Sequence, residues 1–284
     1  MAESLSMMNN LNESILKQYS SSNLFDSIRN ALLKTNKNLD KLTTKDLTPV
    51  DFFHIRGHQS TKELADACNL NPKMKILDIG CGIGGTARYL VSNYNCFVSG
   101  LDIIDEYTKT ASNLSELLNL NDKTEFKTGS ATQLPYEGET FDVVWTEHVQ
   151  MNIRDKNKFY SEVFRVLKKG GKFVFHDVFT ENKDAVIYPV PWADDKSISY
   201  LMRVKEIEHL LKSLKYKISF WEDKTEISAE AFQKSVENIK RSGLPPLGLH
   251  LLMGENTIEK IKNMARNLME DRVTVLQCIC IKRE

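Results

Sequence analysis

The stretch Ile76–Gly85, which reads ILDIGCGIGG, places a short apolar run directly before a cluster of glycines. An apolar run of this length predicts a buried strand, and the spacing of apolar residues over Ala87–Tyr94 predicts a helix. Glycine lets the chain turn tightly and approach a ligand closely, because it has no Cβ. The stretch therefore predicts a strand, a tight turn and a helix that hold a ligand at the end of the strand.

Strand and helix signals alternate around this turn. The predicted strands are Met74–Ile79, Phe97–Leu101, Thr124–Lys127, Phe141–Trp145 and Lys172–Asp177. The predicted helices are Lys62–Cys68, with Ser60 or Thr61 as its cap, Ala87–Tyr94, Tyr107–Leu118 and Asp155–Leu167. Because the strands are continuous apolar runs, we expect a parallel sheet that is buried on both faces.

The remaining segments depart from this alternation. Apolar spacing over residues 12–35 predicts one or two amphipathic helices before the core. After a helix over Val204–Leu214, the strands Lys217–Trp221 and Val273–Ile281 are expected to pair antiparallel at the sheet edge. Between them, Phe232–Lys240 and Ile258–Leu268 are predicted helices, separated by a segment with two prolines. We interpret this insertion as a helical cap.

Composition narrows the class of protein. The 284 residues are 41% apolar and 27% charged, typical of a globular protein, and lysine plus arginine equal aspartate plus glutamate at 38 each. With no basic excess, a nucleic acid partner is not expected. The five cysteines form no C-x-x-C pair, and His176 and His209 have no metal-ligand spacing, so no metal is predicted. Without an apolar run long enough for a bilayer, we expect a cytoplasmic chain without a membrane span.

Two aspartates indicate which ligand the glycine turn holds. Gly80, Gly82 and Gly85 also fit G-x-G-x-x-G, the spacing of dinucleotide sites. Asp78 precedes these glycines, where a carboxylate repels a pyrophosphate but accepts hydrogen bonds from an ammonium group. Asp102 follows the next predicted strand and suits the ribose hydroxyls of any nucleoside. The pair favours a nucleoside ligand that carries an ammonium group, with a nicotinamide cofactor as the alternative.

Three blocks in this order resemble the class I S-adenosylmethionine-dependent methyltransferases. They are the glycine turn, Phe141–Trp145 (FDVVW) and Arg165–Gly171 (RVLKKGG). The resemblance covers about Phe52–Asp223 and is closest to a branch that includes sarcosine and dimethylglycine N-methyltransferases. That branch also looks like the tocopherol and sterol C-methyltransferases, so the resemblance leaves the methyl acceptor open.

The resemblance and the alternation together imply an α/β fold with a Rossmann-like, doubly wound, mostly parallel seven-stranded sheet and an antiparallel C-terminal strand. N-terminal helices and the helical cap complete it. We expect a helical lid over residues 1–60, a cofactor-binding core over 61–224, the cap insertion over 225–270 and a final core strand over 271–284.

By the same resemblance, S-adenosylmethionine is the cofactor and S-adenosylhomocysteine the product. Relatives commonly carry an acid after the glycine of the third strand's loop, but this chain has Ser130 there, so backbone groups are expected to assist the adenine contact. The expected cofactor-binding residues are Asp78, Gly80, Cys81, Gly82, Gly84, Gly85, Asp102, Ile103, Ser130, Ala131, Glu147 and His148.

Candidates for the acceptor site follow the fourth strand. His148 is the candidate general base, with a histidine hydrogen-bonded beside the cofactor as the alternative. Met151 and Asn152 are expected to face the acceptor, and Asn152 stands where several relatives have a histidine. Methyl transfer to a neutral amine does not require this histidine, because the reaction needs proximity and a dry site more than proton removal.

Residues outside this loop complete the expected acceptor site. His54 and Arg56 precede the core, and Arg56 is a candidate partner for an acceptor carboxylate or else a solvent-facing cation. Tyr188 and Trp192 follow the fifth strand and either face a cationic nitrogen with their rings or pack the lid.

These features favour N-methylation of a small amine. The alternatives are C- or O-methylation of a quinol- or sterol-like lipid, with His148 as the base, and a non-catalytic module that binds the cofactor. The acceptor is expected to be a small molecule, and the chain a monomer or homodimer.

Overall fold

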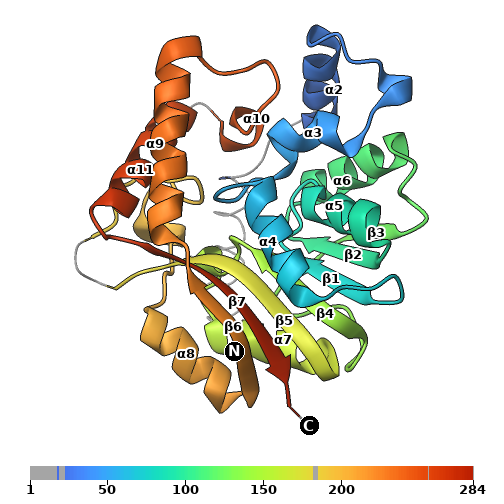
Figure 1. Ribbon diagram of the computed structural model, residues 1–284, viewed down its shortest axis with the longest axis vertical. Coiled ribbons are helices and arrows are strands. Elements are labelled where there is room, and N and C mark those ends of the chain that lie inside the picture. The colour runs from blue at the N-terminus through green and yellow to red at the C-terminus, as the bar shows by residue number, and fades with distance from the viewer. Residues whose placement is uncertain (1–17, 19–22, 182–184, 255, 284) are drawn as a thin grey trace, which may run out of the picture.

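The computed structural model describes residue 18 and residues 23–181, 185–254 and 256–283 (Figure 1). Its strands are β1 (Lys75–Ile79), β2 (Phe97–Asp102), β3 (Thr124–Thr128), β4 (Phe141–Glu147), β5 (Leu167–Phe179), β6 (Tyr216–Asp223) and β7 (Thr274–Lys282). Its α-helices are α2 (Leu24–Lys34), α3 (Thr44–Asp51), α4 (His58–Cys68), α5 (Gly85–Tyr94), α6 (Asp105–Leu117), α7 (Lys156–Val166), α8 (Val204–Ser213), α9 (Thr225–Ser242), α10 (His250–Met253) and α11 (Thr257–Met269). Short 3₁₀ helices cover Leu39–Lys41, Gln150–Asn152 and Lys196–Ile198.

The strands form one sheet in the order β3-β2-β1-β4-β5-β7-β6. Pairing is parallel from β3 through β5, and β7 runs antiparallel to both β5 and β6. The order reverses between β1 and β4, which makes the carboxyl edge of these two strands the expected place for a ligand. The predicted fold class is confirmed, including the antiparallel final strand.

Helices cover both faces of the sheet. Leu64 of α4 and Leu90 of α5 pack with Ile76 of β1 on one face, whereas Val163 of α7 packs with Leu77 on the other. Successive strand residues point to opposite faces, so neighbouring positions of β1 enter different cores. This explains why the strands are apolar without alternation.

The insertion after β6 forms the expected helical cap. Helices α9 and α11 pack against each other, and Figure 1 shows them across from α2 and α3, with α10 between the two groups. Of the predicted N-terminal helices over residues 12–35, the structure describes α2, while residues 12–17 and 19–22 lie outside the described part. The division of the chain into four domains stays a prediction.

Some predicted elements have different limits. Helix α4 begins at His58, not Lys62, so Ser60 and Thr61 lie inside the helix and do not cap it. Helix α3 was not predicted, because Pro49 and several polar residues obscure its pattern. Strand β5 begins at Leu167 because this residue pairs with Phe141 of β4, ahead of the glycines.

All five cysteines are buried and free of disulfides. Within the described ranges, the structure contains no helix long and apolar enough to cross a bilayer. Among the same residues, no cluster of three or more histidine, cysteine, aspartate or glutamate side chains could hold a metal ion.

Candidate active site

The glycine turn after β1 opens a ligand site at the carboxyl edge of the sheet. Gly82 lines the cavity with φ +53°, and a Cβ built there would meet no atom within 4 Å. Gly85 serves packing instead, since its Cβ would lie 2.0 Å from the carbonyl oxygen of Asp51 in α3. Neither Gly84 nor Gly85 borders the cavity, so the structure places these two predicted cofactor residues behind the turn.

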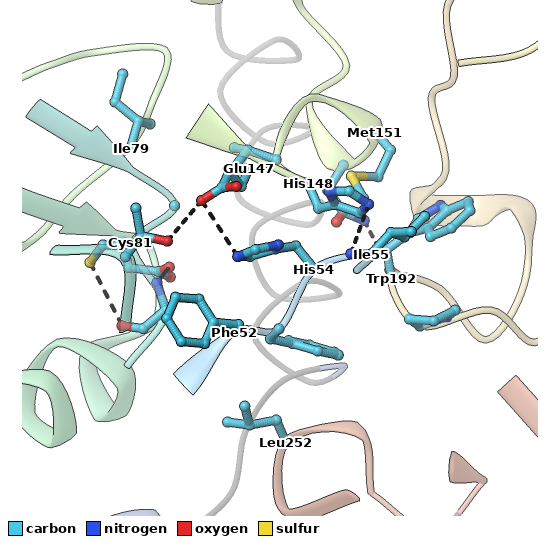
Figure 2. A pocket seen from close by; sticks show the side chains of 18 of the residues that line it. Phe52, His54, Ile55, Ile79, Cys81, Glu147, His148, Met151, Trp192 and Leu252 are labelled. Atoms are coloured by element: carbon cyan, nitrogen blue, oxygen red, sulfur yellow. Dashed lines mark hydrogen bonds and ion pairs between the residues drawn. The ribbon is translucent and has the colours of Figure 1, made fainter. Parts of the chain in front are cut away.

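A cavity of about 1410 Å³ extends from the glycine turn to the cap. Small-molecule sites usually measure roughly 300–1,000 Å³, so this one has room for a cofactor and a second ligand. Figure 2 shows Cys81 on one side of the cavity and Trp192 on the other, with His54 and Glu147 between them. The cavity therefore joins the predicted cofactor residues to the predicted acceptor residues.

Three acidic side chains, Asp78, Asp102 and Glu147, lie at the turn end of the cavity. Burial, together with the nearby carboxylates of Glu147 and Asp102, raises the pKa of Asp78 well above its usual value. Asp78 is 2% exposed, and its Oδ2 atom has no hydrogen-bond partner among the described residues. An unsatisfied buried carboxylate oxygen is costly, so this position suits a ligand that brings a hydrogen-bond donor or a positive charge.

Asp102 is held by backbone groups at the end of β2. Its two carboxylate oxygens accept hydrogen bonds from Gly82 N and Ile104 N, both at 2.9 Å. Burial raises the pKa of Asp102, and these backbone N–H groups lower it. The carboxylate is thus fixed at the cavity wall. Ile103, and Ser130 and Ala131 in the loop after β3, also line the cavity.

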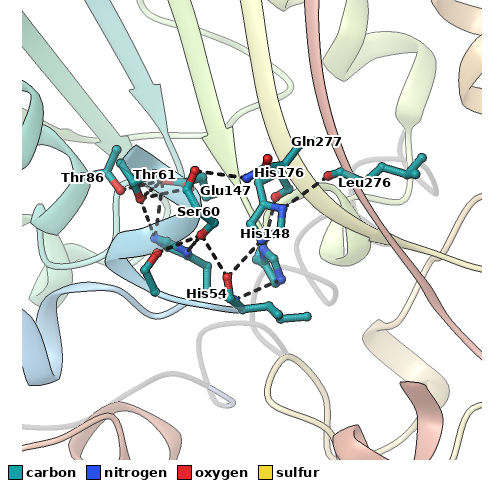
Figure 3. Close-up of polar contacts among 11 residues, drawn as sticks. His54, Ser60, Thr61, Thr86, Glu147, His148, His176, Leu276 and Gln277 are labelled. Atoms are coloured by element: carbon teal, nitrogen blue, oxygen red, sulfur yellow. Dashed lines mark hydrogen bonds and ion pairs between the residues drawn. The ribbon is translucent and has the colours of Figure 1, made fainter. Parts of the chain in front are cut away.

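Glu147 connects the core to α4 and α5 (Figure 3). Its carboxylate accepts hydrogen bonds from Thr86 Oγ1 at 2.8 Å and from Thr61 Oγ1 at 3.0 Å, and His54 Nε2 lies 3.4 Å away. Burial raises the pKa of Glu147, and the nearby His176 opposes this rise. Thr61 and Thr86 belong to the site, and sequence reasoning missed both.

His148 and His54, which line the cavity, each have both ring nitrogens in polar contacts. His148 Nδ1 lies 3.1 Å from the carbonyl oxygen of His176, and its Nε2 accepts from Ile55 N at 3.4 Å. Burial, reinforced by His176 and His54, lowers the pKa of His148 well below its usual value. His54 contacts Ser60 Oγ through Nδ1 at 3.1 Å and Thr61 Oγ1 through Nε2 at 3.2 Å, and burial lowers its pKa to about 3.

The other predicted acceptor residues have distinct environments. Arg56 lines the cavity, but its guanidinium donates to both carboxylate oxygens of Glu63, at 2.8 and 2.5 Å. This pairing leaves it poorly placed for an acceptor carboxylate, and it is not a solvent-facing cation either, because its side chain is only 6% exposed. Asn152 lines the cavity and donates to the carbonyl oxygens of Trp192 and Ile198 at 3.0 Å.

The loop after β5 contributes one of its two aromatic side chains to the cavity. Trp192 and Met151 line it, whereas Tyr188 does not and packs into the neighbouring apolar core. Trp192 donates from Nε1 to Ser199 Oγ at 2.9 Å. None of the cap residues that line the cavity was predicted as an acceptor contact; they are Ala231, Phe232, Ser235, Leu249, Leu252, Met253, Ile261 and Met264.

Comparisons with known proteins agree with this geometry. Residues 77–175 match the family model described as a methyltransferase domain. Over 130 residues the chain is 32% identical to the glycine/sarcosine/dimethylglycine N-methyltransferase of Actinopolyspora halophila, covering 46% of this chain and 23% of the relative. Over 175 residues it is 30% identical to the sterol 24-C-methyltransferase of Candida albicans, covering 59% and 46%.

A solved structure shows the same fold over most of the chain. It is Haemonchus contortus phosphoethanolamine N-methyltransferase 2 in complex with phosphomonomethylethanolamine and S-adenosylhomocysteine. The TM-score is 0.72 at 19% identity, and the match covers 90% of this chain and 60% of that one.

The sheet order and the acidic glycine turn define a class I methyltransferase fold. Residues 77–175, which hold the glycine turn, match the methyltransferase domain family, and the chain has the fold of the S-adenosylmethionine-dependent class I methyltransferases. It spans less than half the length of the two curated relatives named above.

Proposed function

We propose that the chain transfers the methyl group of S-adenosylmethionine to a small molecule, and that the accepting atom is the nitrogen of a neutral amine. The observation that supports this cofactor is the Oδ2 atom of Asp78, which has no hydrogen-bond partner among the described residues and is buried at the cavity wall that Gly82 also lines. The ammonium of a methionine moiety supplies the donor that this oxygen lacks.

The residues of the turn fit the cofactor's other parts. Asp102 would accept from ribose hydroxyls, Ile103 and Ala131 would cover the adenine, and the open space at Gly82 would admit the methionine chain. S-adenosylmethionine, when bound, supplies an electrophilic methyl group on a positively charged sulfur. Burial raises the pKa of both Glu147 and Asp78, and a cationic ligand would oppose this rise by stabilising their ionised forms.

The engaged histidines support nitrogen as the accepting atom. His54 and His148 both line the cavity, and each has both ring nitrogens in polar contacts within the chain. A tertiary amine needs no base, because its lone pair forms the new N–C bond while the S–C bond breaks and sulfur keeps that electron pair. The protein's part is then to align the two reactants and to exclude water.

A second candidate is methylation of carbon or oxygen in a quinol- or sterol-like lipid. The apolar residues of the cap helices that line the cavity favour this reaction, and one relative named above is a sterol C-methyltransferase. This reaction needs a proton acceptor, and His148 Nε2 would have to exchange its 3.4 Å contact with Ile55 N for the acceptor's proton.

The test uses the purified chain with methyl-labelled S-adenosylmethionine and a panel of tertiary amines, phenols and quinols. The proposal expects transfer to amines, with His148→Gln retaining most of the turnover. Transfer only to phenols or carbon, abolished in His148→Gln, would support the second candidate instead. Cofactor binding without transfer to any compound would indicate a non-catalytic module.

A further inference from the structure

The half of the cavity farthest from the glycine turn is lined by uncharged residues of the cap helices. Every cap residue that lines it in the described chain is uncharged, and most are aliphatic or aromatic. Phe232 of α9, Leu252 of α10 and Met264 of α11 all border this space. Figure 2 shows Leu252 on the opposite side of the pocket from Glu147.

The charged residues of the cap lie elsewhere. Glu230, Lys234 and Glu237 of α9 are exposed and do not line the cavity. Lys260 of α11 is buried, and its Nζ atom lies 3.0 Å from both Asp194 Oδ1 and the carbonyl oxygen of Met253. The helices therefore turn an apolar face toward an open cavity, a surface that becomes stable against water only when apolar ligand covers it.

Cations that border the cavity are on the core side or already paired. Arg56 is bound to Glu63, and Lys156 donates to the carbonyl oxygens of Gln150 and Ile153. Arg154 and Lys158, near the start of α7, are exposed to solvent. A phosphate or carboxylate placed against the cap would thus lose its hydration without gaining a cation there, and such burial is costly.

Building on the proposed function, we propose that the acceptor is an amine on an apolar body, alkyl or aromatic, which the cap helices enclose. It lacks the phosphate group of phosphoethanolamine and the carboxylate group of sarcosine. A dry chamber also keeps the amine in its neutral, nucleophilic form, because desolvation disfavours the ammonium.

The experiment measures binding rather than turnover, so that it does not depend on catalysis. N,N-dimethylbutylamine, -hexylamine and -octylamine are titrated by calorimetry into the chain with S-adenosylhomocysteine, and again without it. Each buried methylene adds roughly 0.8 kcal/mol, so affinity should rise about 15-fold from butyl to hexyl. Phosphoethanolamine and sarcosine serve as ionic comparison compounds and should show no saturable binding.

Two variants on one helix locate the site. Ser235 borders the cavity yet its side chain is exposed, so Ser235→Lys introduces a charge without forcing its burial. We expect Ser235→Lys to weaken the binding of N,N-dimethyloctylamine at least tenfold and to leave the binding of S-adenosylhomocysteine unchanged. Asn238→Lys, the matched control, adds the same charge at an exposed position of α9 outside the cavity and should change neither.

The outcomes separate this inference from the proposed function. Binding that rises with chain length and falls in Ser235→Lys supports an apolar acceptor. If S-adenosylhomocysteine binds but affinity is flat along the series, or if the ionic amines bind more tightly, the inference is overturned while the proposed function stands. If S-adenosylhomocysteine does not bind, the proposed function fails. The amine titration without S-adenosylhomocysteine then still shows whether the part of the cavity lined by the cap binds apolar amines.

Discussion

Removing the cation of the buried Asp51–Arg88 ion pair should destabilise the protein strongly. Arg88 of α5 is fully buried, and its Nη2 atom lies 2.5 Å from Oδ1 of Asp51, the last residue of α3. Arg88→Met keeps most of the side-chain volume but leaves the Asp51 carboxylate buried without a partner. Loss of one partner of a buried pair costs about 3–5 kcal/mol in the free energy of unfolding.

The loss in the free energy of unfolding of Arg88→Met should also depend on pH. Burial raises the pKa of Asp51 and Arg88 lowers it, so the substitution removes the influence that favours the ionised form. In the variant the folded state then binds its proton more tightly than the unfolded state, and stability is lost as pH rises. The difference from the parent chain should therefore be smaller at pH 4.5 than at pH 7.5.

Urea denaturation followed by circular dichroism measures both effects. Lys168→Met is the control, since it breaks the exposed Lys168–Asp142 pair and should change the free energy of unfolding far less. A loss below about 1 kcal/mol in Arg88→Met at pH 7.5 would refute the reasoning, because a buried unpaired charge cannot be that inexpensive.

Three further predictions follow from the site. Gly82→Ala and Gly170→Ala both place a Cβ at positive φ in open space, so both should lose about 1 kcal/mol of stability, but only Gly82→Ala should weaken S-adenosylhomocysteine binding in calorimetry. Because burial lowers the pKa of His54 to about 3 and of His176 to about 4, their ring NMR signals should not shift between pH 5.5 and 8; a titration in that range would contradict their burial. Burial lowers the pKa of Lys156 to about 7, so between pH 7 and 9 the unfolded chain binds one proton more than the folded chain. Urea titrations should therefore show that the free energy of unfolding of the parent chain rises by up to about 1.4 kcal/mol per pH unit relative to Lys156→Met.

Sequence patterns predicted the sheet and the ligand-binding turn because these depend on local signals. The run before Gly80 and the strand ending at Asp102 both occur as predicted, and both aspartates reach the cavity. Helix α3 was not predicted because its contact with the core is tertiary. Gly85 has no Cβ, so the backbone of Asp51 can approach it closely. No local pattern in residues 44–51 reports that contact.

The acceptor side could be predicted only in part, because its contacts join distant residues. Thr61 and Glu147 are 86 positions apart, and the 3.4 Å contact that engages His148 comes from the backbone of Ile55. The pattern of Arg56 gave no indication of its pairing with Glu63, since each is common on a solvated surface. Such pairings are set by packing of α4 against the sheet.

Calorimetric titration with S-adenosylmethionine, S-adenosylhomocysteine and NAD shows which cofactor the glycine turn binds. Asp78→Asn is the matched variant, because it keeps the side-chain shape and replaces one carboxyl oxygen by an amide NH2 group, which cannot accept a hydrogen bond from an ammonium group. The account predicts saturable binding of the first two ligands, at least tenfold weaker in Asp78→Asn, and none of NAD. Binding of NAD alone, or equal affinity of both chains for S-adenosylhomocysteine, would contradict it.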